Sequence, residues 1–367
     1  MKKTQFALAA LALVASTAAF ADGATVYGTI DASVTKSSND QTAFDGSGNW
    51  AGSIFGFTGS EDIEGGLKAT YALEVGLNAG SGRMANGGTA GTVNSSGVAG
   101  TATAASGTST VFNRQANIGL AGDFGAIKAG LQVSPYIVSV LSSGVATNNE
   151  SFYVPLFVIS GSAAATTDGS FGASTGGFFI PNSVSYSTPS IGGFSATALT
   201  ALNNPSTAST ATAVINANKY TAYNVGYAAG DIRANFGYED ANSNAFAGGA
   251  SKNYSITGSY QLGAIGLSAG YIDHKNVATP ANDKHTYAMG AAFDASEKIQ
   301  LSANYAKNNL AASQSLTVLG AQYKLSKTTA LYTTIGRGTN GAVALYSGAS
   351  TSTGTTTSYA VGMYKSF

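Results

Sequence analysis

Apolar and polar residues alternate one by one through long stretches of this chain. In residues 25–34, TVYGTIDASV, one side carries Val26 and Ile30, while the other carries Thr29 and Asp31. The same alternation recurs in 66–78 (GLKATYALEVGLN), 253–262 (NYSITGSYQL) and 298–306 (KIQLSANYA). Successive side chains of a β-strand point to opposite faces, so this period of two predicts strands with one apolar and one polar face. Glycine and β-branched residues fill the stretches without a 3.6-residue period, which argues against helices.

Roughly sixteen such segments of about 8–13 residues follow one another along the chain. They begin near residues 25, 50, 66, 110, 125, 181, 192, 219, 231, 251, 264, 284, 296, 314, 327 and 357. Short turns such as SEDIEGG and AGDFG alternate with longer links, notably 80–109, 133–180, 203–218 and 339–355. That rhythm is typical of an up-and-down barrel in a membrane. We therefore predict an all-β chain, a transmembrane 16-stranded antiparallel up-and-down β-barrel.

Composition favours a membrane barrel over a soluble β-sandwich, which alternation alone does not exclude. Charged residues make up 10% of the chain, against about 25% in typical soluble domains. Mean hydropathy is nevertheless only +0.09, and after the N-terminus the sequence has no apolar run of the ~18 residues that a spanning helix needs. The predicted strands are also longer than the 5–6 residues usual in sandwiches. No linker or shift in composition suggests a second domain.

The N-terminus predicts export. Lys2 and Lys3 precede an apolar stretch over 6–20, and AFA at 19–21 is a small-x-small cleavage site. We expect residues 1–21 to be a cleaved signal peptide and 22–367 to be the barrel. Loss of the two lysines would leave 16 basic against 18 acidic residues, which argues against a nucleic-acid partner. The sequence has no cysteine, so it offers neither disulfides nor thiol chemistry.

Four motifs, spread in order over the chain, resemble those of Gram-negative trimeric porins of the proteobacterial outer membrane. They are FGFTGSEDIEGGLKATYALEVG at 55–76, FNRQANIGLAGDFGAIKAG at 112–130, PNSVSYSTPSIGGFS at 181–195 and the closing VGMYKSF at 361–367. The resemblance implies a homotrimer in the cell outer membrane with a water-filled pore in each subunit. It also implies outer-membrane lipid and lipopolysaccharide as surroundings. Phe367 would be the terminal aromatic signal that the barrel-assembly machinery reads.

The resemblance further implies that the third long loop, residues 133–180, folds into the barrel. Its acids, Glu150 and Asp168, would then face basic residues of the wall. Arg114 matches the arginine of the family's NRQA motif and is the first candidate for that wall. The other candidates are Arg83, Lys68, Lys128, Arg233 and Arg337. If Arg114 faces the lumen, alternation places its neighbours Gln115 and Asn117 outside.

Several positions that are often basic in the family are neutral in this sequence. They are Ile54, Thr58, Leu131, Phe179, Ser185 and Tyr364. We therefore expect weak ion selectivity. The third loop is also unusually aromatic, with Tyr136, Phe152, Tyr153, Phe157, Phe178 and Phe179. These rings could pack the loop against the wall, form a hydrophobic constriction that prefers less polar solutes, or contact a neighbouring subunit.

Other functions find less support in the residues. A membrane-embedded hydrolase needs a base beside a nucleophile, and the two histidines, His274 and His285, flank a polar loop without a distinctive serine motif. His274 with Asp273 and Asp283 has no specific metal-binding spacing. The glycine-rich residues 80–109 lack the GK[ST] of a phosphate loop. An adhesin or structural barrel predicts a plugged lumen, whereas the polar faces suit water.

We therefore expect a channel for passive diffusion of small hydrophilic solutes and ions, with neither cofactor nor energy coupling. The end of the chain fits this architecture. Alternation places Phe367, Met363, Val361 and Tyr359 toward lipid, and Ser366, Tyr364 and Gly362 toward the lumen. The last strand would pair with the first to close the sheet.

Overall fold

The computed structural model describes residues 24–38, 42–85, 111–147, 149, 178–202, 219–242, 251–276, 283–309, 313–340 and 354–367. The long strands are β1 (Thr25–Ser37), β3 (Ile54–Ile63), β4 (Leu67–Asn78), β6 (Gln115–Gly122), β7 (Gly125–Val133), β8 (Phe179–Ser187), β9 (Phe194–Ala201), β10 (Lys219–Ala229), β11 (Ile232–Asn242), β12 (Ser251–Leu262), β13 (Ile265–Asn276), β14 (Lys284–Asp294), β15 (Ile299–Asn308), β16 (Ser315–Lys324), β17 (Thr329–Gly338) and β18 (Thr356–Ser366). The short elements are β2 (Ala43–Asp45), a 3₁₀ turn (Glu64–Gly66), β5 (Arg83–Ala85) and α1 (Pro135–Ala146).

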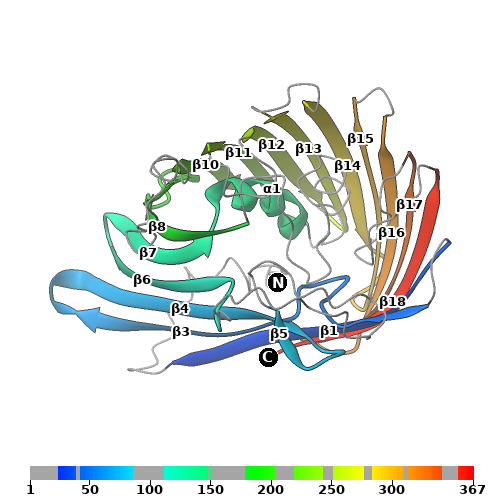
Figure 1. The fold of residues 1–367 in the computed structure, drawn as a ribbon, viewed down its shortest axis with the longest axis horizontal. Helices are drawn as coiled ribbons and strands as arrows, with labels where there is room; N and C mark the ends of the chain where they lie inside the picture. Colours follow the sequence, from blue (N-terminus) through cyan, green and yellow to red (C-terminus); the bar gives the residue numbers. More distant parts are fainter. Residues whose placement is uncertain are drawn as a thin grey trace, which may run out of the picture.

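The strands form one closed antiparallel barrel, which confirms the predicted fold class (Figure 1). Two of the eighteen strands, β2 and β5, have three residues each, and the remaining sixteen complete the ring through the pairing of β1 with β18. Phe367 N donates to Gly28 O at 3.0 Å and Gly28 N to Phe367 O at 3.1 Å, so the last residue closes the sheet. Among the described residues, no helix is long and apolar enough to cross a membrane.

The barrel has a short-turn rim and a long-loop rim. Strand pairs such as β10–β11 and β12–β13 join through two residues at the short-turn rim. The start of β1 and the end of β18 also lie at this rim. The predicted strand starts agree with the structure except near two long-loop connections. There β3 begins at Ile54 rather than near 50, and β6 begins at Gln115 rather than near 110.

Over most of the sheet the strands turn apolar side chains outward and polar side chains inward. In β15, Leu301 is 45% exposed on the outside, whereas Gln300 is 2% exposed on the inside. In β18, Tyr359, Val361, Met363 and Phe367 are exposed outward, as alternation predicts. Lipid can cover an apolar exterior, and closure of the sheet gives each long strand a hydrogen-bonded neighbour on both sides.

Residues 134–147 and Asn149 fold into the barrel, where Thr147 contacts Ser268 and Asn149 contacts Asn304, and Figure 1 shows α1 inside the ring beside β10–β12. Pro135 opens the helix, where its fixed φ is favourable and its missing N–H costs nothing. Ser134 caps it, because Ser134 Oγ accepts a hydrogen bond from Tyr136 N at 3.2 Å. Sequence analysis placed this stretch inside the barrel as a loop and did not predict the helix.

Candidate functional site in the barrel lumen

Neutral groups hold α1 on the inner faces of β10–β13. Ser139 Oγ lies 2.6 Å from Ser255 Oγ, and Thr257 Oγ1 donates to Ser139 O at 2.6 Å. The helix approaches β11 so closely that a Cβ on Gly237 would lie less than 2.5 Å from the hydroxyl of Ser139. Glycine at 237 therefore permits the helix to dock.

An apolar cluster lies between α1 and the wall. Tyr136, Ile137 and Val140 of the helix are buried against residues that include Ile180 and Tyr220. Phe178, at the end of the loop, belongs to the same cluster. Tyr136 and Phe178 therefore pack the inward loop against the wall rather than project into the lumen.

Glu150, Asp168, Phe152, Tyr153 and Phe157 lie outside the described residues.

Another part of the wall carries Arg114, the first candidate among the predicted basic residues. Arg114 directly precedes β6, and its Nε donates to Glu74 Oε1 on β4 at 2.5 Å. Tyr27 OH donates to Glu74 Oε2 at 2.9 Å, and Gln115 Nε2 lies 3.4 Å from the same oxygen. The guanidinium carbon of Arg114 sits 4.7 Å from the ring centroid of Phe179, a cation–π geometry.

The other predicted basic residues do not gather around Arg114. Lys68 pairs with Asp62 at 2.5 Å near the short-turn rim. Arg233, also near that rim, donates to Gly230 O and Ile232 O at 2.8 Å. Lys128 pairs in the β-ladder with Ser185 on the lumen face and forms no ion pair with the residues described.

Arg337 and Arg83 are the two remaining predicted basic residues of the wall. Arg337 is exposed on the same face of β17 as Leu331 and Ile335, which are on the outside, so it does not belong to the lumen wall. This corrects the sequence-based assignment. The backbone of Arg83 pairs with Asn78, and its side chain lies outside the described part.

The expected orientation of Gln115 and Asn117 is also wrong. Ile118 and Leu120 are exposed outward, so Asn117 between Ala116 and Ile118 points inward, where it is buried and donates to Leu131 O at 3.0 Å. Arg114 precedes the strand and does not follow its alternation. Leu131 pairs with Ala116 and therefore lies on the outward face, not in the lumen.

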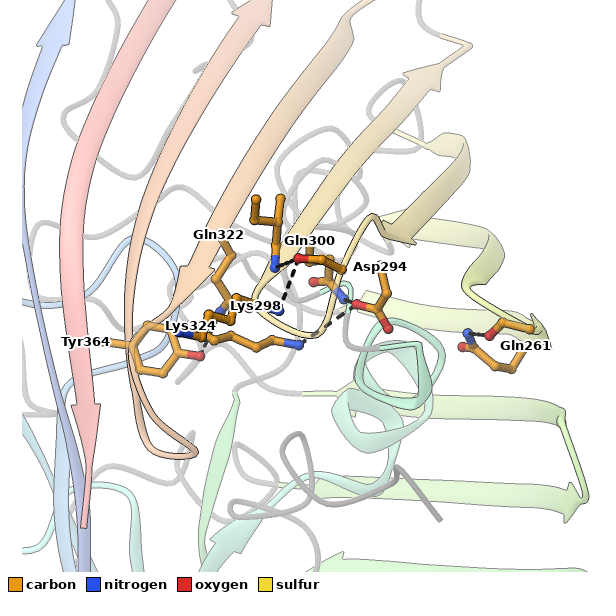
Figure 2. Close-up of polar contacts among 10 residues, drawn as sticks. Gln261, Asp294, Lys298, Gln300, Gln322, Lys324 and Tyr364 are labelled. Carbon is orange, nitrogen blue, oxygen red and sulfur yellow. Dashed lines mark hydrogen bonds and ion pairs between the residues drawn. The ribbon is translucent and has the colours of Figure 1, made fainter. Parts of the chain in front are cut away.

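Figure 2 shows a polar cluster on the inner faces of β14, β15, β16 and β18. Gln300 Nε2 donates to Asp294 Oδ1 at 3.0 Å, and Lys324 Nζ lies 3.9 Å from that oxygen. Gln322 Nε2 donates to Tyr364 OH at 2.7 Å. Of these residues sequence analysis singled out only Tyr364, although all lie on the polar side of their strands.

Sequence analysis also missed the buried carboxylates of the inner wall. Asp31, Glu74 and Glu239 are almost completely buried, and each accepts hydrogen bonds from a tyrosine. Their place on the polar face of an alternating strand was the available signal. Each carboxylate is engaged within the protein, so none of them presents an open negative charge to the pore.

The two histidines do not form a common site. His274 is buried on the inner face, with Nδ1 2.6 Å from Asn253 Oδ1, whereas Asp273 and His285 contact each other on the outer face at 3.2 Å. The backbone alternation separates His274 from Asp273 because adjacent residues of a strand face opposite sides. Within the part of the chain described, no group of three or more His, Asp or Glu side chains could hold a metal.

Comparisons with known proteins agree with this geometry. The family model described as Gram-negative porin matches residues 7–342. Outer membrane porin protein 32 of Delftia acidovorans is 29% identical over 348 residues, which cover 90% of this chain and 88% of that protein. Among solved structures, an anion-selective porin from Comamonas acidovorans shares 23% identity at a TM-score of 0.69, covering 94% of this chain and 99% of that one.

A second solved structure, the trimer form of OmpT from Vibrio cholerae, shares 14% identity at a TM-score of 0.59 and covers 95% and 100% of the two chains. The family match spans most of the chain, and the barrel has the apolar exterior and polar interior that a membrane channel requires. The protein is thus a channel rather than an enzyme. The chain belongs to the Gram-negative porin family and forms an outer-membrane channel for passive diffusion.

Proposed function

We propose that this channel passes small hydrophilic solutes and ions with weak ion selectivity. The observation that supports this most directly is the ion pair of Arg114 with Glu74 at 2.5 Å. A paired cation attracts passing anions less, because the fields of the two charges largely cancel beyond a few ångströms. Phe179 also covers the guanidinium. The pore therefore lacks an open arginine at this point of the wall.

The neutral positions point in the same direction. Ile54, Thr58, Ser185 and Tyr364 lie on the inward faces of their strands and contribute no charge where relatives often carry basic residues. Lys128 keeps a positive charge on the lumen face, which would leave a mild anion preference. The similar Comamonas acidovorans protein is described as anion-selective, and we propose that this chain differs from it in degree.

Reversal potentials across a planar bilayer under a salt gradient test the proposal. We expect a small potential, corresponding to a chloride-to-potassium permeability ratio near unity. A large potential showing strong preference for either ion would contradict it. The same recording tests one alternative, since a silent protein that binds surfaces would support an adhesin. Liposome swelling tests the other, since faster passage of less polar solutes would support an aromatic constriction.

We also propose that the protein is a homotrimer whose subunits meet through the exterior of β4 and β6–β9. The described outward residues of these strands include no charged side chain, and many are small, such as Ala69, Ala129 and Ala198. Ala129→Trp should weaken the trimer, whereas Ala269→Trp on the exterior of β13 should not. Native mass spectrometry in detergent measures this, and unchanged trimers of Ala129→Trp would contradict the assignment.

The exterior of the other strands supports lipopolysaccharide as a partner. Four exposed cations, which we call the outer cationic row, lie near the long-loop rim: Lys252, Lys275, Lys307 and Arg337. Below them lie outward tyrosines that include Tyr254, Tyr271 and Tyr287, at the level where aromatic rings favour the membrane interface. Lys252 and Lys275 also contact Asp240 and Asp273 at 3.3 and 3.9 Å. Because its four cations outnumber these two carboxylates, the outer cationic row can attract phosphorylated lipid headgroups.

Replacing the four cations by glutamine should lower the affinity for purified lipopolysaccharide by roughly fivefold per residue, from about 1 kcal/mol each. Lys365→Gln is the matched control, since Lys365 also faces outward but at the short-turn rim. Equal binding by the fourfold variant and the wild type would contradict the assignment.

Phe367 supports recognition by the barrel-assembly machinery, because it is exposed at the end of the closing strand with its ring over Gly28. Phe367→Ala keeps the two backbone hydrogen bonds to Gly28 and should reduce insertion in cells while leaving refolding in detergent intact. Normal insertion would contradict this role.

A further inference from the structure

Residues 46–53, which connect β2 with β3, leave the sheet and fold into the lumen. Trp50 is only 4% exposed, and its ring centroid lies 5.4 Å from that of Tyr332 on β17. A Cβ on Gly320, near the middle of β16, would lie 3.1 Å from the indole. Tyr332 and Gly320 both lie on inward faces, so the segment crosses from its own strands to cover β16 and β17 from the inside.

One carboxylate is at the centre of the contacts that hold this segment, whose two ends also accept hydrogen bonds from the backbone of Ala79 and Leu77. Asp31 Oδ2 accepts hydrogen bonds from Trp50 N at 2.8 Å and Ala51 N at 2.7 Å, and Asp31 Oδ1 accepts one from Tyr332 OH at 2.5 Å. Ser53 Oγ bonds the backbone of Asp31 in both directions at 3.0 Å. Hydrogen bonds to an ionised acceptor are roughly twice as strong as neutral ones. Asp31 therefore joins β1, β17 and the inward segment at one point.

We propose that residues 46–53 form a second constriction element, which narrows the pore from the side away from α1, and that Asp31 is its positioning residue. Figure 1 places α1 beside β10–β12, while β16, β17 and β1 lie across the ring from them. Gly52 is exposed, and a Cβ there would meet only a methyl group of Ile54 at 3.9 Å. The free side of the segment thus borders the lumen. The inference rests on the diffusion channel described above.

The sharpest test is a single cysteine at Gly52, because the native chain has none. A charged methanethiosulfonate reagent is added during bilayer recording of Gly52→Cys. The thiolate attacks the reagent's sulfenyl sulfur, a mixed disulfide forms and sulfinate leaves. We expect current to fall in discrete steps and to recover with reductant. Val361→Cys, 64% exposed on the exterior, is the control and should show no steps.

Release of the segment is the complementary test. Asp31→Ala should raise single-channel conductance and admit larger sugars in liposome swelling. Trp50→Ala leaves Asp31 in place and should raise conductance in the same way, but less. If Asp31→Ala does not insert into the membrane, Trp50→Ala tests the same prediction.

These experiments distinguish a failure of the channel function from a failure of the constriction element. A wild-type protein that does not conduct would overturn the channel itself. A conducting Gly52→Cys protein that mass spectrometry shows to be fully modified, yet whose current is unchanged, would overturn only the constriction element. Conductance equal to wild type in both Asp31→Ala and Trp50→Ala would also overturn it.

Discussion

Two parts of the lumen wall hold inward structure in different ways. The α1 wall, formed by β10–β13, binds its helix through an apolar cluster and hydroxyl contacts such as Ser139–Ser255. Its buried carboxylate, Glu239, accepts hydrogen bonds from Tyr220 and Asn253 of the wall strands. The carboxylate wall, which runs from β16 through β1 to β4, uses Asp31 to hold residues 46–53 and Glu74 to hold Arg114.

The helix α1 is held by many contacts spread over its wall, whereas the carboxylate wall relies mainly on one carboxylate at each place. Many weak neutral contacts tolerate the loss of any one, because each net hydrogen bond contributes only about 0.5–1.5 kcal/mol. A buried carboxylate with several partners behaves differently, since its removal leaves donors or a cation unpaired in a poorly solvated place. Single substitutions should therefore disturb the carboxylate wall more than the α1 wall, except where a new atom cannot fit.

Among the substitutions that test this comparison, Glu74→Gln should have the largest effect on stability and ion selectivity. It leaves Arg114, 21% exposed, without its counter-ion. Breaking a buried pair costs about 3–5 kcal/mol, and we expect the lower end because water partly reaches Arg114. The freed cation should shift the permeability ratio several-fold toward anions. Reversal potentials and thermal unfolding in detergent measure the two effects.

Arg114→Gln is the opposite change and should shift permeability toward cations, because Glu74 then keeps its charge alone. The double variant Glu74→Gln/Arg114→Gln should return the ratio close to that of the wild type. Unchanged ratios in both single variants would remove the pair from the conducting path, and with it the reason for weak selectivity.

Gly237→Ala should have the next largest effect, because it attacks the α1 wall where an added atom cannot fit. The new Cβ would overlap the hydroxyl of Ser139 and approach that of Ser255 to 2.6 Å. Overpacking of this kind costs about 1–3 kcal/mol, and the helix should move toward the pore axis and lower conductance. Gly258→Ala is the control, since its Cβ would meet only Arg233 O at 3.4 Å. Equal unfolding midpoints in the two variants would contradict close docking.

Much of the barrel could be predicted from the sequence because the exterior and the lumen impose a period of two on every strand. The same reasoning assigns faces correctly inside strands, as for Val361 and Tyr364 in β18. It fails for Arg114, which precedes β6 and does not share its alternation. Arg337 is a different case, because it follows the alternation of β17 and shares the outward face of Ile335, so period-two reasoning from the sequence was enough to place it outside.

The inward segments could not be predicted in the same way. Residues 135–146 read as an apolar loop because their partners, such as Tyr220 and Ile180, are distant in sequence. The predicted strand that begins near residue 50 overlaps the end of residues 46–53, whereas β3 begins at Ile54. Ion pairs such as Arg114–Glu74 depend on strand register, which composition and motif spacing do not specify.

Ser139→Ala with Ser255→Ala should show the smallest effect. Either single change removes the hydroxyl contact at 2.6 Å, but Thr257 still donates to Ser139 O, a backbone atom that the substitution keeps. The apolar cluster around Ile137 and Val140 is also untouched. A double-mutant cycle on unfolding should therefore yield a coupling of about 0.5–1.5 kcal/mol with conductance unchanged. A large rise in conductance from Ser139→Ala alone would mean that the position of α1, like that of residues 46–53, depends mainly on one side chain, and the distinction between the two walls would fail.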